Sequence, residues 1–145
     1  MAVGNISIDL IHSAGGFARR VAGSSFYASL AAARLGVKSA VLAKAGSDID
    51  PKRDLAPLLR ASVSLDGLIL GGSTASYELF YRGEDRTLRL RKVGEPISPD
   101  EVRALGIDCQ AVLASPIYNE IPIETVRELR RRCRLLAIDP QGYIR

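Results

Sequence analysis

Residues 22–46 read AGSSFYASLAAARLGVKSAVLAKAG, and this stretch decides the fold class. Its first half predicts a helix, because apolar residues recur at helical spacing among alanines, at Phe26, Leu30, Ala33 and Leu35. Ser24 or Ser25 is expected as the N-cap and Gly36 as the C-cap. The short apolar run at 39–43, bounded by glycines, is typical of a buried strand in a parallel sheet. The stretch therefore predicts a helix followed by a buried strand.

The sequence on both sides of this stretch continues the alternation of strands and helices. Upstream, Ile6, Ile8 and Leu10 alternate with other residues and predict a half-buried strand. Downstream, apolar spacing and caps predict helices at 51–61, 99–105 and 122–132 and strands at 111–114 and 135–138. Three β-like segments, with a hairpin turn at 83–85, lie at 68–70, 74–82 and 86–93. We expect an α/β domain with a mostly parallel sheet and a small β insertion.

The composition is that of one globular domain without a membrane span. The chain has 145 residues, 47% of them hydrophobic, and its apolar runs are far shorter than the ~20 residues of a transmembrane helix. We expect a cytoplasmic protein, because residues 1–5 show no secretory pattern and the two cysteines have no metal-ligand or disulfide-framework spacing. The net charge of +4 is spread out, and the arginine-rich run at 130–134 has no interleaved aromatic residues. We expect no nucleic-acid partner.

Polar residues stand directly after three apolar runs, at the places where parallel sheets bind ligands. They are Asp9, the Gly23-Ser24 turn before the helix, and the corner at 46–48. A glycine turn at a helix start exposes backbone N–H groups, and a carboxylate accepts hydrogen bonds from neighbouring hydroxyls. This combination favours recognition of a polyol. The alternative stays open that the glycines only form turns and that Asp9 only caps a strand end.

Taken in order, these motifs resemble the first half of the ribokinase-like (PfkB) carbohydrate kinases, over nearly the whole chain. The family's opening Gly-x-x-x-x-Asp, its first signature and its Gly-x-Asp match Gly4, Asp9, Ala22, Gly23, Ser29, Gly36, Gly46 and Asp48. The region of about 68–93 resembles the β-lid of the family. The segments 116–122 and 139–145 resemble later motifs of a subgroup.

Two positions depart from the family pattern. Tyr27 stands where many members have an asparagine that contacts the sugar, and Ser25 replaces a small apolar residue or glycine. These departures argue against ribose or fructose as the substrate rather than against the family. Tyr27 is interpreted either as a substrate contact or as an aromatic residue of the helix that packs in the core or faces the lid.

The resemblance implies a ribokinase-like three-layer sandwich, present in part, with residues 1–145 as the amino-terminal portion of the kinase domain. It implies transfer of the γ-phosphoryl group of ATP, with Mg²⁺, to a hydroxyl of a sugar, nucleoside or related polyol. A homodimer through the β-lid is also expected. The substrate-binding residues that the resemblance implies are Asp9, Gly23, Ser24, Tyr27 and Asp48.

The part of the family pattern that performs phosphoryl transfer has no counterpart in the sequence. Neither the Gly-x-Gly-Asp motif of the anion hole and catalytic base nor the Asn-x-x-Glu motif is present. No catalytic, cofactor-binding or metal-binding residue is therefore assigned, and the base is expected beyond residue 145. One interpretation is a truncated kinase that is inactive alone. The alternative is a non-catalytic module that binds a polyol or dimerises and needs a second half.

Overall fold

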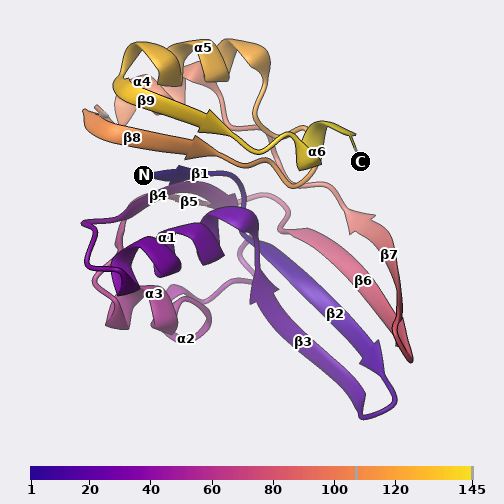
Figure 1. The fold of residues 1–145 in the computed structure, drawn as a ribbon. Helices are drawn as coiled ribbons and strands as arrows, with labels where there is room; N and C mark the ends of the chain where they lie inside the picture. The colour runs from indigo at the N-terminus through magenta and orange to yellow at the C-terminus, as the bar shows by residue number, and fades with distance from the viewer. Residues whose placement is uncertain (107, 145) are drawn as a thin grey trace.

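The computed structural model describes residues 1–106 and 108–144, and a five-stranded parallel sheet, sheet A, lies at its centre (Figure 1). The strands of sheet A, in spatial order, are β5 (Ser64–Leu70), β4 (Ala40–Ala45), β1 (Ala2–Val3), β8 (Cys109–Ala114) and β9 (Cys133–Ile138). Every neighbouring pair runs parallel. The predicted α/β class with a mostly parallel sheet is confirmed.

Helices cover both faces of sheet A and complete a three-layer sandwich (Figure 1). They are α1 (Ser24–Arg34), α2 (Pro51–Asp54) and α3 (Ala56–Arg60) on one face and α4 (Pro99–Ala104) and α5 (Ile123–Arg131) on the other, with α6 (Gln141–Ile144) after β9. Phe26 and Leu58 belong to the core on the first face, and Val112 and Leu129 to the core on the second. The helix predicted at 51–61 is split into α2 and α3. Among the described residues, no helix has the length and apolar composition of a membrane-spanning segment.

A second sheet, sheet B, extends away from the sandwich (Figure 1). Its strands, in spatial order, are β3 (Gly16–Ala22), β2 (Ser7–Ser13), β6 (Ala75–Arg82) and β7 (Asp85–Lys92). The β2–β3 and β6–β7 pairs are antiparallel, and β2 runs parallel to β6. The sequence places the insertion at 68–93, but residues 68–70 lie in sheet A and the hairpin at 7–22 supplies half of sheet B.

The hydrophobic pattern explains why these boundaries were wrong. β3 carries an exposed Phe17 and the two successive cations Arg19 and Arg20, so it shows no strict alternation of apolar and polar residues. The apolar run at 68–70 suits either sheet, and only its pairing with β4, with Leu68 opposite Ala43, places it in sheet A.

Helix α1 begins with a backbone conformation rather than with a capping side chain. Gly23 precedes the helix with φ at +117°, and no side chain caps the first turn, so the predicted serine N-cap is wrong. The Ser25 hydroxyl instead donates to the carbonyl oxygen of Gly4 at 2.6 Å. At α4 the prediction is confirmed, because Ser98 accepts from the Glu101 N–H and the Glu101 carboxylate accepts from the Ser98 N–H.

Candidate functional site

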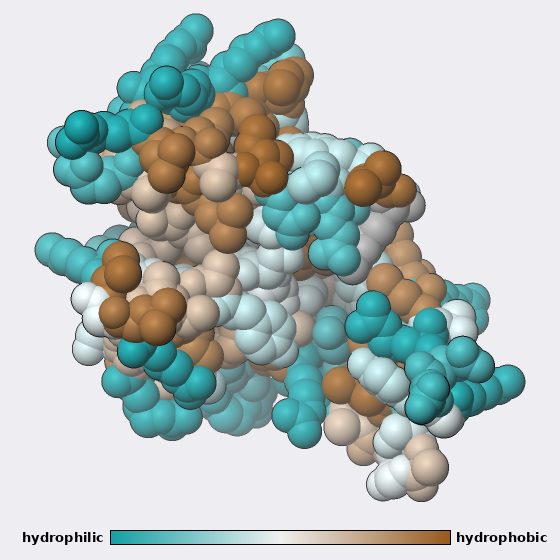
Figure 2. Space-filling model, viewed as in Figure 1, coloured by the Kyte–Doolittle hydropathy of each residue, from teal (hydrophilic) through white to brown (hydrophobic). Residues whose placement is uncertain are grey.

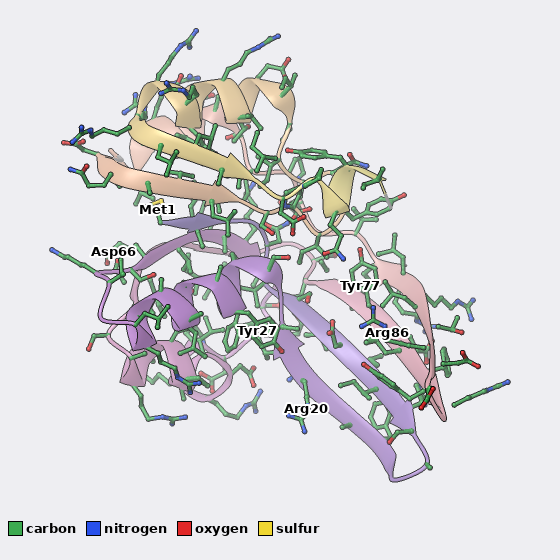
Figure 3. The ribbon with its side chains drawn as sticks, in the orientation of Figure 1. Met1, Arg20, Tyr27, Asp66, Tyr77 and Arg86 are labelled. Carbon is green, nitrogen blue, oxygen red and sulfur yellow. The ribbon has the colours of Figure 1, made fainter. Side chains whose placement is uncertain are left out.

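A cavity of about 190 Å³ lies between sheet B, the start of α1 and the loops that follow β8 and β9. The hollow between the sandwich and sheet B is visible in Figure 2, and Figure 3 labels Tyr27, Tyr77 and Arg86 around it. The residues that line the cavity are Ser7, Asp9, Ala22, Gly23, Ser24, Tyr27, Tyr77, Leu79, Arg86, Leu88, Ile117 and Gln141. Four of the five substrate-binding residues named from the sequence are therefore brought together.

The fifth residue, Asp48, lies elsewhere. It lines a separate groove with Ile8 and Leu10, whose side chains point to the face of β2 opposite to that of Asp9. The Asp48 carboxylate accepts a hydrogen bond from the Thr74 hydroxyl, which in turn accepts from the Gly46 N–H at 2.7 Å. The expectation that Asp48 converges with Asp9 is wrong, and Asp48 fixes a turn instead.

Asp9 lies inside β2 rather than at the end of a strand, because the first apolar run is divided between β1 and β2. The Ser7 hydroxyl, two residues away on the same face of the strand, contacts an Asp9 carboxylate oxygen at 3.4 Å. A carboxylate accepts hydrogen bonds, so this side of the cavity can bind the hydroxyl groups of a ligand.

The turn at Gly23 brings the backbone of α1 to the cavity. Position 23 requires glycine for two reasons. Its φ of +117° is disfavoured for L-residues, and a Cβ there would lie 2.6 Å from the Asn5 carbonyl oxygen. Gly23 and Ser24 both line the cavity, and no acidic residue lies in the first turn of α1. The positive end of this eleven-residue helix therefore faces the cavity and offers N–H donors.

Sheet B supplies an apolar wall that was only partly foreseen. Tyr77 and Leu79 lie on the same face of β6, and both are buried. The Tyr77 hydroxyl donates to the Ile117 carbonyl oxygen at 3.0 Å and so joins sheet B to the loop after β8. Leu88 of β7 completes the wall. The aromatic and leucine side chains can pack on the C–H surfaces of a small ligand.

Glu120 holds the loop after β8 in place, and sequence reasoning missed it. Its carboxylate is 3% exposed and accepts hydrogen bonds from the N–H groups of Asn5 (3.1 Å), Ile117 (2.7 and 2.9 Å) and Tyr118 (2.7 Å). Burial and the nearby Glu120 carboxylate raise the pKa of Tyr143, whose hydroxyl donates to the Ile121 carbonyl oxygen. The only sequence signal is a carboxylate in a proline-bounded loop.

Asn5 lies where the chain passes from sheet A to sheet B. Its side chain accepts from the Lys44 N–H at 3.0 Å and donates to the Glu95 carbonyl oxygen at 2.8 Å. Glu95 lies where the chain returns from β7 toward α4, so one buried asparagine joins two of the four places where the chain crosses between the sheets. Together with Glu120, it fixes how sheet B is placed over the cavity.

Comparison with known proteins identifies the fold. No model of a protein family and no curated protein matches the chain. A pyrophosphate-dependent kinase in the ribokinase family, solved with a pyrophosphate analog and myo-inositol, matches 99% of the chain and 50% of its own length at 24% identity, with a TM-score of 0.85. The chain therefore has the fold of ribokinase-like kinases, and the resemblance drawn from the sequence is confirmed at the level of fold.

Two further structures share this fold. An uncharacterized sugar kinase from Pyrococcus horikoshii, solved with ATP, matches 95% of the chain at 18% identity and a TM-score of 0.75. A PfkB protein from a Polaromonas species matches 96% at 15% identity and a TM-score of 0.74. The match covers 51% and 54% of these two proteins. The chain thus spans about half the length of the kinases that it matches.

Proposed function

We propose that this chain is the acceptor-binding part of a ribokinase-like kinase, which transfers a phosphoryl group to a hydroxyl of a sugar, nucleoside or related polyol. The observation that supports the proposal is the gathering of Asp9, Gly23, Ser24 and Tyr27 in one cavity under β6 and β7. At about 190 Å³, the cavity is smaller than the roughly 300–1,000 Å³ of typical drug-sized sites, which suits one small polyol.

Each part of the cavity has a role in this proposal. Asp9 accepts hydrogen bonds from acceptor hydroxyls, and the backbone N–H groups at Gly23 and Ser24 donate to acceptor oxygens. Tyr27 and the apolar wall of sheet B pack on the carbon skeleton of the acceptor. Sheet B acts as the lid that excludes water from the reacting groups.

The phosphoryl donor proposed is ATP with Mg²⁺, and the matched structures include both an ATP complex and a pyrophosphate-dependent kinase. Among residues 1–106 and 108–144, no group of three or more His, Cys, Asp or Glu side chains could hold a metal ion. Because the chain spans about half the length of the matched kinases, we propose that donor, metal ion and general base are held by residues of the other half of such a kinase. The chain supplies the positioning of the acceptor, which is a large part of phosphoryl transfer.

Replacing Asp9 by asparagine should weaken polyol binding at least about tenfold, because hydrogen bonds to a charged acceptor contribute roughly 1.5–3 kcal/mol. Binding would be measured by calorimetry on the 145-residue chain, with a ligand selected from neutral polyols, sugars and nucleosides by thermal shift. Asp48→Asn is the matched control, since Asp48 lines the separate groove on the opposite side of β2, and it should leave the affinity unchanged. Equal losses in the two variants would contradict the proposed site.

A cytoplasmic location is proposed from the cysteines. Cys109 and Cys133 are register partners in the adjacent strands β8 and β9, yet both are free thiols. Burial, the largest effect, raises the pKa of Cys109 and keeps it a neutral thiol. Two neighbouring reduced cysteines fit a reducing compartment.

A homodimer through sheet B is proposed because β3 and β7 are edge strands with exposed apolar side chains, including Phe17 at 62% exposure. Sedimentation should show a dimer at tens of micromolar, and Phe17→Asp should shift it toward monomer. Leu135→Asp is the control, because Leu135 is equally exposed on the edge strand β9 of sheet A and should not affect the dimer. A monomer at all concentrations, or a dimer that only Leu135→Asp disrupts, would contradict this interface.

A further inference from the structure

Among the described residues that line the cavity, Arg86 is the only cation. The strand register explains how it reaches there: Arg86 pairs with Tyr81 and Leu88 with Leu79, so both β7 side chains share the face of β6 that forms the apolar wall. Arg89 lies on the opposite face of β7 and lines the groove of Asp48. β7 thus presents one arginine, Arg86, toward the cavity, next to Leu88 on the same face.

No carboxylate neutralises Arg86 within residues 1–106 and 108–144. The ion pairs there include Arg91 with Glu78, at 3.5 Å on the outer face of sheet B, but none includes Arg86. Its guanidinium is always charged and carries five N–H donors in a planar fork that suits a carboxylate or a phosphate. Water molecules accept hydrogen bonds from an exposed guanidinium, but a lid that closes on a ligand removes that water, so the guanidinium then needs an acceptor on the ligand.

Arg86 and Asp9 reach the cavity from different levels of sheet B. Asp9 pairs with Tyr77, near the base of sheet B, whereas Arg86 pairs with Tyr81, near the tip of the β6–β7 hairpin. Four residues of a strand separate Tyr77 from Tyr81, which is about 13 Å along β6. A ligand that contacts both residues therefore carries its hydroxyls and its anionic group at different places on one small molecule.

We propose that Arg86 binds an anionic group of the acceptor, so that the acceptor is a polyol or sugar that carries a carboxylate or a phosphate. Arg86 is then the specificity-determining residue, which binds the anionic group, while Asp9 binds the hydroxyls. This inference rests on the proposed acceptor site. It predicts that the cavity prefers anionic acceptors over neutral polyols.

The test compares three open-chain six-carbon probes, glucitol, gluconate and glucitol 6-phosphate, by calorimetry with the 145-residue chain. Gluconate or glucitol 6-phosphate should bind at least about tenfold more tightly than glucitol, as a charge-assisted bidentate contact allows. The better of the two identifies the anion as carboxylate or phosphate. Arg86→Gln should remove the preference for the anionic probes. Arg89→Gln, which removes the same charge from the opposite face of β7, should preserve the preference.

The outcomes separate this inference from the proposed function. Glucitol binding equal to that of both anions, or a preference that Arg89→Gln reduces as much as Arg86→Gln does, overturns the role of Arg86 and leaves the acceptor site standing. If none of the three probes binds and Asp9→Asn changes nothing for any other polyol, the acceptor site itself is overturned. Thermal unfolding of both arginine variants should match that of the unmodified chain, because neither arginine has an ion-pair partner in the described structure.

Discussion

Glu120→Ala should lower the free energy of unfolding by about 3–5 kcal/mol, because it leaves several buried N–H groups without an acceptor. The Glu120 carboxylate accepts from the backbone of Asn5, Ile117 and Tyr118, and it is almost completely buried. The loss would be measured by urea denaturation. The loop that carries Ile117 into the cavity should become mobile, so polyol affinity should fall as well.

Two further variants show whether the Glu120 carboxylate itself is responsible for this loss of stability. Glu120→Gln keeps the size of the side chain and one acceptor oxygen, and its loss should be intermediate. Glu124→Ala removes an exposed carboxylate four residues later, in the first turn of α5, and should cost no more than about 1 kcal/mol. If Glu120→Ala is no more destabilising than Glu124→Ala, the loop is held by other contacts.

Gly23→Ala is expected to destabilise the chain by at least about 3 kcal/mol and to abolish polyol binding. The backbone at position 23 has φ at +117° and ψ at 142°, a region essentially restricted to glycine, which alone costs roughly 1–3 kcal/mol for alanine. The added Cβ would also lie 2.6 Å from the Asn5 carbonyl oxygen, so the turn that brings α1 to the cavity must move. Denaturation gives the stability and calorimetry the affinity.

Gly36→Ala separates the steric effect from the backbone effect. Gly36 directly follows Leu35, the C-cap of α1, with φ at +82°, and the Cβ that alanine would add there meets open space. The expected cost is therefore only the left-handed backbone penalty of about 1–2 kcal/mol, with polyol binding retained. Equal stability losses at the two glycines would show that the close approach to Asn5 is unimportant.

The central unit of the fold could be predicted because local signals agree there. Residues 24–34 show helical spacing, end at a glycine and lead into an apolar run, and the structure has α1 and β4 in that place. These features depend on neighbours in sequence, so periodicity reveals them.

The parts that sequence could not supply depend on contacts between distant segments. Asp9 and Asp48 both follow apolar runs and look alike in sequence. Successive side chains of β2 point to opposite faces, however, so Asp9 lines the cavity on one face and Asp48 lines the groove on the other. Glu120 resembles any acidic residue of a loop until folding brings the N–H group of Asn5 against it. Arg86 was one of many arginines, and only the pairing of β7 with β6 separates it from Arg89.

Mapping a bound polyol by NMR on the isotopically labelled chain tests the acceptor site most directly. Titration with the tightest-binding polyol should shift the backbone amide signals of Gly23, Ser24 and Leu79 and leave those of Gly46 and Asp48 in place. Shifts confined to the groove around Asp48, or an absence of shifts at saturating ligand, would contradict the site proposed between α1 and sheet B.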